Sequence, residues 1–347
     1  MMTKATLNRI YPFALLILVF VVWKIRQSSS EAEKIQFSGN TMGPIIYNVT
    51  YLSENGKDWS KEVDSLLKVW NHSLSTYIAD SEISQFNNDS CFSFVSPYFL
   101  PVLKESREIY QKTNGAFDPT VAQIVNAWGF GPDKSNNLPD TAKIDSLLNW
   151  VGFDHISFNN EQVCKEKRGV SLDFSAIAKG YAVDVVADFL SEKGIENYLV
   201  EIGGELICKG KNANGKPWKI AIDDPRVELY ERRLFAKIDL TDKAMATSGN
   251  YRNYYVRNGR KYAHTINPKT GFPVEHNLLS ATVLANNCMT ADAYATAFMV
   301  LGVEQSKKIL NQSPELEAFL VFADENGDLA TFSTKALENI IEQVDAE

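Results

Sequence analysis

The stretch Ser171–Leu190, with the sequence SLDFSAIAKGYAVDVVADFL, decides the fold around the site. Its first residues alternate between apolar and polar, which predicts a half-buried strand. From Ile177 onward the apolar residues recur every four positions, as they do on the buried face of an amphipathic helix. The acid Asp173 therefore ends a predicted strand, and Lys179 falls in the first turn of the predicted helix.

This arrangement predicts a phosphate site. The free N–H groups at a helix start attract an anion, and the side chain of Lys179 adds a full positive charge. The small residues Ser175 and Ala176 leave room in the turn before the helix. The alternative is an ordinary strand–helix junction with a surface lysine, because the stretch contains neither a GxGxxG nor a GxxxxGKS loop.

The composition is that of a globular protein. The chain has 347 residues, of which 45% are hydrophobic and 22% charged, enough for one large domain or two small ones. The net charge of −8, without a cluster of Lys and Arg, argues against a nucleic-acid surface. GxSxG, HExxH and Walker motifs are absent from the sequence, so hydrolase and P-loop functions lack their signatures.

The N-terminal segment indicates export. Basic residues flank the apolar run 10–23, which is short for a spanning helix and typical of a secretory signal. Because neither an A-x-A cleavage site nor a nearby cysteine follows, an uncleaved signal anchor is favoured over a cleaved peptide, with a buried core helix as the third alternative. We expect residues 1–30 to form this segment and its linker, and residues 31–347 to form one exported domain.

The remaining sequence predicts an α+β fold with largely antiparallel sheets and flanking helices, because short strands outnumber helices and many are joined by hairpin turns. The run 198–208 is predicted as one strand with a bulge or close backbone approach at its glycine pair. The run 74–86 is predicted as a polar loop with a buried tyrosine, Tyr77. The four cysteines are far apart and form no CxxC motif, so their pairing cannot be assigned from spacing.

A second candidate site lies in the predicted helix 290–301, with Thr290 as its cap. Asp292 and Thr296 are four residues apart, so their oxygens project from one helix face. A carboxylate and a hydroxyl surrounded by alanines suit a hard cation such as Mg²⁺. The alternative is a solvated helix face with an aspartate near the N-terminus.

His264 is the candidate general base, because it lies at the end of a predicted strand that runs into the turn Asn267–Gly271. The alternative is a histidine hydrogen-bonded within that turn.

The ordered blocks NTMGPIIYNV, STYIADSEISQFN, TNGAFDPTV, LDFSAIAKGYAVD, YLVEIGGEL, ATSGNYR, HTINPKTGFPV and MTADAYATAFMVLG extend from about Gly39 to about Gly302. In this order they resemble the ApbE family of FAD:protein FMN transferases, which attach FMN to a threonine of a target flavoprotein. The sequence departs from the family pattern at Ser175-Ala176, where many members have a glycine pair. It also lacks the lipobox cysteine of many members.

The resemblance implies a role for each matching residue. Those expected to contact the flavin nucleotide are Met42, Tyr77, Ala116, Phe117, Asp118, Asp173, Lys179 and Ile266. Those expected to bind Mg²⁺ are the Ala176 carbonyl and the side chains of Asp292 and Thr296. His264 matches the histidine that helps to activate the acceptor.

The resemblance also implies the reaction. The acceptor hydroxyl would attack the FMN phosphate of FAD in a Mg²⁺-dependent step that releases AMP. The acceptor would be an exported or membrane flavoprotein, such as a subunit of a sodium-pumping or Rnf-type redox complex, and the enzyme would be anchored in the bacterial inner membrane or periplasmic. Two alternatives stay open: an exported FAD-binding carrier and a Mg²⁺-dependent FAD pyrophosphatase.

Overall fold

The computed structural model describes residues 32–131, 138–225, 233–250, 254–257 and 260–344, together with Ile17 and Phe20. Apart from those two residues, the N-terminal apolar run and its linker lie outside the described part. Within the described residues, no helix has the length and apolar character needed to cross a membrane.

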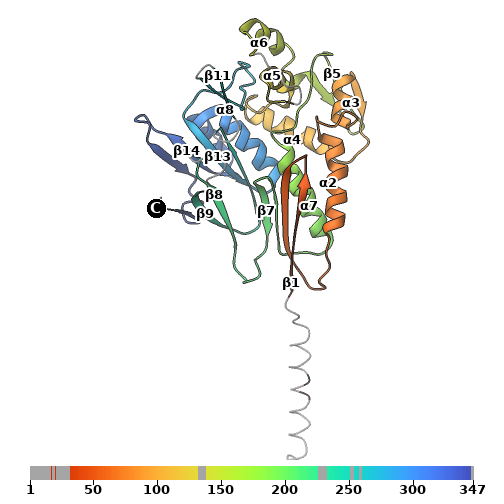
Figure 1. Ribbon diagram of the computed structural model, residues 1–347, viewed down its shortest axis with the longest axis vertical. Helices are drawn as coiled ribbons and strands as arrows, with labels where there is room; N and C mark the ends of the chain where they lie inside the picture. Colours follow the sequence, from red (N-terminus) through yellow and green to blue (C-terminus); the bar gives the residue numbers. More distant parts are fainter. Residues whose placement is uncertain are drawn as a thin grey trace, which may run out of the picture.

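The fold is built on one large antiparallel sheet (Figure 1). Its eight strands follow the spatial order β1, β2, β6, β7, β10, β13, β14 and β15. In that order, their bounds are Glu33–Thr41, Ile45–Ser53, Tyr198–Ile202, Glu205–Lys209, Lys243–Gly249, Leu278–Ala285, Glu317–Ala323 and Leu329–Ser333. Every pairing between neighbours is antiparallel, which agrees with the predicted α+β class.

Helices cover one face of the large sheet and a small sheet covers the other. Helices α2 (Ser60–Leu74), α7 (Ala178–Glu192) and α8 (Cys288–Gln312) contact the large sheet, and α3 (Glu82–Asn88) and α4 (Phe99–Lys112) pack against them. Helices α5 (Ala122–Ala127) and α6 (Thr141–Leu148) belong to a separate small core. The covering sheet contains β8 (Trp218–Asp223), β9 (Leu234–Leu240) and β16 (Ile341–Gln343).

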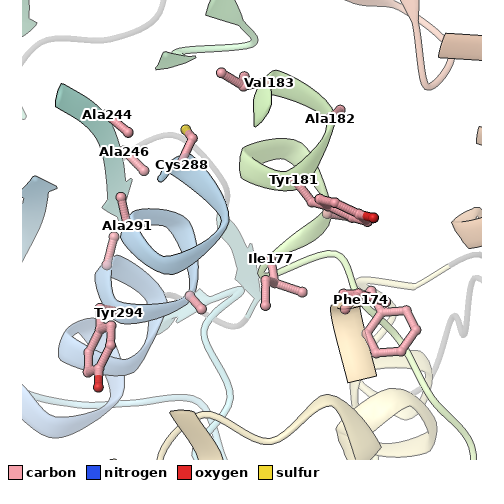
Figure 2. Close-up of a cluster of buried hydrophobic side chains, with 14 of the residues drawn as sticks. Phe174, Ile177, Tyr181, Ala182, Val183, Ala244, Ala246, Cys288, Ala291 and Tyr294 are labelled. Carbon is pink, nitrogen blue, oxygen red and sulfur yellow. The ribbon is translucent and has the colours of Figure 1, made fainter. Parts of the chain in front are cut away.

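Strand periodicity divides the core into two layers. In β10, Ala244 and Ala246 belong to the helical layer, whereas Met245 between them packs with β8 and β9. Figure 2 shows the two alanines beside Cys288 and Ala291 of α8. These small side chains allow α8 to lie close to the sheet, which places the start of the helix near the site.

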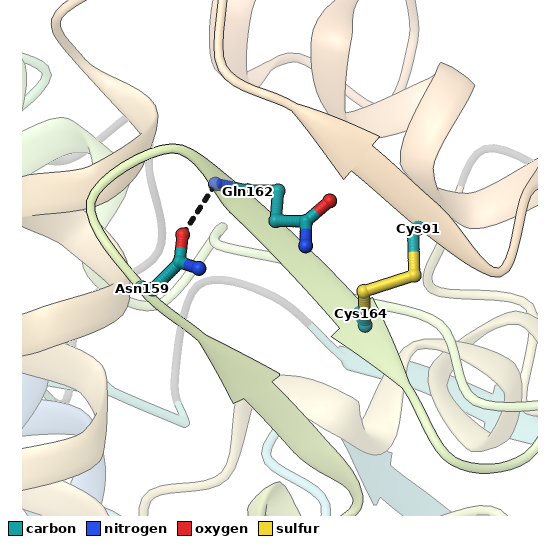
Figure 3. Close-up of a disulfide and its surroundings, with 4 residues drawn as sticks. All are labelled: Cys91, Asn159, Gln162 and Cys164. Carbon is teal, nitrogen blue, oxygen red and sulfur yellow. Dashed lines mark hydrogen bonds between the residues drawn. A yellow bond between two sulfur atoms is a disulfide. The ribbon is translucent and has the colours of Figure 1, made fainter.

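A further small sheet contains β3 (Cys91–Ser93), β5 (Gln162–Lys165) and β4 (Ile156–Phe158). Cys91 and Cys164 are directly opposite each other in β3 and β5 and form a disulfide (Figure 3). The other two cysteines are free and buried. The remaining described strands, β11 (Tyr254–Arg257) and β12 (Arg260–Ala263), pair with each other.

Two strand predictions are wrong. The run 198–208 is not one strand: β6 and β7 form a hairpin in which Ile202 pairs with Glu205, and Gly203 and Gly204 make the turn at φ 62° and 106°. Positive φ at both turn positions explains the glycine pair.

The run 170–174 is extended but belongs to no sheet. It has the predicted alternation of burial, yet the side chain of Asn87, not a neighbouring strand, bonds both the N–H and the C=O of Leu172, at 2.7 and 2.9 Å. Periodicity reports which residues are buried and does not identify the partner that buries them.

Candidate active site

The start of α7 is fixed from two sides. The backbone N–H of Asp173 donates to the carbonyl of Pro119 at 2.8 Å, and the N–H of Ala178 donates to the carbonyl of Phe174 at 2.7 Å. Lys179 is the second residue of α7, as predicted, and the residue at the N-cap, Ile177, provides no side-chain cap. The positive end of the helix dipole and the lysine therefore point toward the same region.

Lys179 forms an ion pair with Glu205, the first residue of β7. The Glu205 side chain is only 3% exposed, whereas that of Lys179 is 28% exposed, so the ammonium lies between the buried acid and the surface. Burial alone would lower the pKa of Lys179, but the nearby carboxylates of Glu205 and Asp292 raise it above its ordinary value. The lysine is therefore positively charged at neutral pH.

The second oxygen of Glu205 has no partner. Oε2 is buried and makes no hydrogen bond to another described residue. It lies beside Gly203, where an added Cβ would come within 3.9 Å of Oε2 and 3.6 Å of the Lys179 side chain. A buried acceptor without a donor is energetically unfavourable, which marks this oxygen as available to a ligand, a cation or water.

Asp292 lies one turn into α8 and is 3% exposed. Its Oδ2 accepts a hydrogen bond from the backbone N–H of Gly180 at 2.9 Å. Gly180 permits this contact, because a Cβ there would collide with the carbonyl of Cys288 and approach the Cβ of Asp292 to 2.7 Å. Burial raises the pKa of Asp292, an effect that Lys179 opposes.

The predicted partner of Asp292, Thr296, lies one turn further along α8, as the four-residue spacing requires. Its Oγ1 is 3.2 Å from the Oγ of Ser248 in β10. Ala176 lies in the turn immediately before α7 and is partly exposed. A carboxylate, hydroxyls and a carbonyl are the oxygen donors that Mg²⁺ takes, so this donor set fits the predicted ion. Within the described ranges, no group of three or more His, Cys, Asp and Glu could hold a metal.

Side chains of the protein accept hydrogen bonds from the free backbone N–H groups in the first turn of α8. Asn287, not Thr290 as predicted, is the N-cap, and its side chain accepts from the Thr290 N–H at 2.7 Å. In addition, Asp184 of α7 accepts from the N–H groups of Cys288 and Met289 at 2.7 and 2.8 Å. The helices thus exchange carboxylates: Asp184 binds the start of α8, and Asp292 binds the start of α7.

Three of the segments matched to the flavin nucleotide are separate loops, which contain Met42, Tyr77 and residues 116–118. Tyr77, expected to be buried, is 70% exposed, because it lies in a turn before α3. Burial of part of the ring and the charge of Asp173 raise the pKa of Tyr77, so these two side chains are neighbours. Met42 has φ 48° in the β1–β2 turn. The hairpin that contains Met42 lies next to Gly203, whose N–H donates to the Ile46 carbonyl at 3.0 Å. Gly203 in turn lies beside the side chain of Lys179.

The side chain of Asp118 stabilises its own loop, a role that the sequence pattern did not indicate. Its Oδ1 accepts from the N–H and the hydroxyl of Thr120 at 2.8 and 2.6 Å, and burial raises its pKa to about 6. Ala116 and Phe117 are also buried. The Asp118 side chain therefore shapes the loop whose Pro119 carbonyl holds Asp173.

His264 follows β12 and is half-buried, with its ring 6.4 Å from that of Phe130. The next residue, Thr265, donates to Asn250 at 2.7 Å, just beyond the end of β10 that contacts Thr296. Ile266 is buried against Ile124 and neighbouring residues in a small cluster. The segment after His264 is therefore bonded to the end of β10, which also contacts α8.

The sequence interpretation missed Glu205, Asp184 and Ser248. A signal existed for Glu205, because it is an acid directly after two glycines at the start of an otherwise apolar strand. A signal also existed for Asp184, because it lies four residues after Gly180 and hence on the same face of α7. Ser248 had no comparable signal, since its role depends on the pairing of β10 with distant strands.

Comparison with known proteins identifies the family of the chain. The model of the ApbE family matches residues 42–320. An FAD:protein FMN transferase of Vibrio cholerae is 43% identical over 297 residues, which cover 82% of this chain and 87% of that protein. An FAD:protein FMN transferase of Haemophilus influenzae is 38% identical over 340 residues, covering 94% of this chain and 97% of the relative.

Solved structures of similar proteins have the same fold. The flavin transferase ApbE from Vibrio cholerae superimposes with a TM-score of 0.80 at 38% identity, covering 89% of this chain and 99% of that one. The apo form of the Pseudomonas stutzeri flavinyl transferase ApbE gives a TM-score of 0.79 at 35% identity, covering 89% of this chain and 97% of that one.

Proposed function

The chain belongs to the ApbE family and is an FAD:protein FMN transferase, and from this premise we propose that it transfers FMN to a threonine hydroxyl in a Mg²⁺-dependent reaction. The observation that carries the proposal is the contact between the start of α7 and α8, where Lys179 and Asp292 are close enough for their charges to interact and Thr296 follows Asp292 by one helical turn. These residues supply a cation for the pyrophosphate and oxygen donors for a metal ion.

Each residue has a distinct part in the proposed reaction. Lys179 binds the pyrophosphate of FAD, and Asp292, Thr296 and the Ala176 carbonyl hold Mg²⁺. Bound there, the ion would reduce the negative charge that opposes attack on the FMN phosphate. His264 accepts the proton of the acceptor hydroxyl. The hydroxyl oxygen forms a bond to the FMN phosphorus, the bond from that phosphorus to the bridging oxygen breaks, and AMP leaves with that oxygen.

We further propose that the enzyme acts outside the cytoplasm, anchored by the N-terminal segment or released from it, on an exported or membrane flavoprotein. Support comes from the signal-type apolar run and from the disulfide between Cys91 and Cys164, since such bonds persist in oxidising compartments. A redox-complex subunit fits this location as the acceptor.

The test is intact-mass analysis of an acceptor. The full-length enzyme is incubated with FAD, Mg²⁺ and an exported flavoprotein domain that carries a candidate threonine. We expect the acceptor to gain the mass of one FMN residue, and EDTA or replacement of that threonine by valine to prevent the gain. Free FMN and AMP beside an unmodified acceptor would instead identify a pyrophosphatase, and bound FAD without turnover would identify a carrier.

A further inference from the structure

Lys179, Glu205 and Asp292 form a charge cluster that contains one cation and two buried acids. Both acids act on the charge of the lysine, and Glu205 contacts it directly. The side chain of Glu205 is closed off from solvent, so its charge is poorly screened. Burial raises the pKa of Glu205 to about 7, an effect that Lys179 opposes and Asp292 strengthens. Above that pH, and before any ligand binds, the cluster has an excess negative charge in the region where a pyrophosphate is expected.

Glu205 also competes with the substrate. One of its oxygens already binds the ammonium of Lys179, so a pyrophosphate must share this lysine with a carboxylate. Its other oxygen is buried and finds no hydrogen-bond partner among the described residues, and it lies near Gly203, where the side chains of Ile45 and Lys179 are its apolar and basic neighbours. A divalent cation, or water bound to it, would satisfy this oxygen and reverse the net charge of the cluster.

We propose that Glu205 is the residue that makes binding of the FAD pyrophosphate conditional on the divalent cation. It is a positioning residue: it holds Lys179 and keeps the empty site negative until a cation enters. The inference rests on the proposed Mg²⁺ dependence and deepens it, because it assigns the coupling between the two ligands to one side chain that is not among the predicted metal donors.

Because of this coupling, we expect replacement of Glu205 to change the affinities for FAD and for Mg²⁺ in opposite directions. In Glu205→Gln the cluster loses one negative charge and keeps its shape. FAD without cation should then bind at least about tenfold more tightly, and Mg²⁺ alone at least about tenfold more weakly. One unit charge about 4 Å away at an effective dielectric of about 20 would change a dissociation constant up to about a thousandfold, and screening by solvent reduces this. A variant that merely unfolds would lose both affinities.

The experiment measures two dissociation constants for the full-length chain without acceptor. FAD binding is followed by flavin fluorescence in EDTA and in Mg²⁺ at equal ionic strength, and Mg²⁺ binding by calorimetry. The matched control is Glu201→Gln on the same hairpin, where Glu201 accepts from Gly204 and Asn48, both at 2.6 Å, outside the cluster. Both constants should stay within about twofold in the control, because exposed charges are screened.

The outcomes separate the two claims. Opposite shifts in Glu205→Gln, together with a reduced effect of Mg²⁺ on FAD binding, are the expected result. Changes below about twofold, or a loss of both affinities together, would overturn the role of Glu205. Equal binding of FAD in EDTA and in Mg²⁺ by the unaltered chain would instead remove the proposed metal dependence itself, whatever the variant does.

Discussion

Asp184 and Asp292 are the same residue type, lie at the same helix contact, and each accepts hydrogen bonds from the backbone at the start of the other's helix. They differ in how many carboxylate oxygens these backbone hydrogen bonds use. Asp184 uses both oxygens, one for Cys288 and one for Met289. Asp292 receives the N–H of Gly180 through Oδ2, which leaves Oδ1 as the oxygen for a cation.

This difference shows that an aspartate at the contact between α7 and α8 is not a candidate metal ligand merely because of its place there. Both carboxylates help to hold α7 against α8, but Asp292 also interacts electrostatically with Lys179 and Glu205. Asp184 instead fixes the start of α8 and hence the position of Asp292, which follows one turn later. We therefore expect removal of the Asp292 carboxylate to lower the rate of FMN transfer, and removal of the Asp184 carboxylate to lower the stability of the fold.

The largest effect is expected for Asp292→Ala. Loss of the carboxylate removes the charged donor for Mg²⁺, and we expect FMN transfer to fall by about a thousandfold or more, the scale of a lost electrostatic contact to the transition state. Transfer is measured by intact mass of the acceptor over time. The fold should persist, as judged by circular dichroism, and a folded variant with unchanged rates would contradict the assignment of Asp292.

Asp184→Ala should have its main effect on stability. The N–H groups of Cys288 and Met289 would lose their acceptors in a buried place, which costs about 1–3 kcal/mol of unfolding free energy. Urea denaturation of the variant and of the unaltered chain measures this difference. A residual transfer rate well above that of Asp292→Ala is expected for the folded fraction. An unaltered urea midpoint would show that Asp184 does not hold α8.

The third prediction concerns the pH dependence of stability. Burial raises the pKa of Asp184 from 3.8 to about 7, against the two N–H groups that lower it. The folded state therefore binds this proton more tightly than the unfolded state. The corresponding stability is fully present below the unfolded pKa and is lost as the pH rises through about 7. Unfolding free energy should fall less steeply between about pH 5 and about pH 8 in Asp184→Asn, and parallel curves would exclude this role.

The features that depend on residues close together in the chain could be predicted from the sequence. Periodicity predicted both helices, the place of Lys179 in the first turn of α7, and the common face of Asp292 and Thr296, because these features depend on residues a few positions apart. Hairpin signals likewise predicted the antiparallel class of the sheets.

The non-local part was not accessible. Asp184 meets Cys288 only because β10, β13 and α7 bring together segments 104 residues apart in the chain. The run 170–174 looked like a strand because its burial alternates, but its partners are the side chains of Asn87 and Lys165 and the Pro119 carbonyl, not a neighbouring strand. Tyr77 was expected to be buried from its apolar ring, whereas its turn lies at the surface.

The most direct test of the difference between the two acids is calorimetric titration of Mg²⁺ into Asp292→Asn and Asp184→Asn, both of which remove one charge without changing side-chain shape. We predict that Asp292→Asn weakens Mg²⁺ binding by about tenfold or more, whereas Asp184→Asn stays within about threefold of the unaltered chain. Equal losses, or a larger loss in Asp184→Asn, would contradict the assignment of the metal site to Asp292.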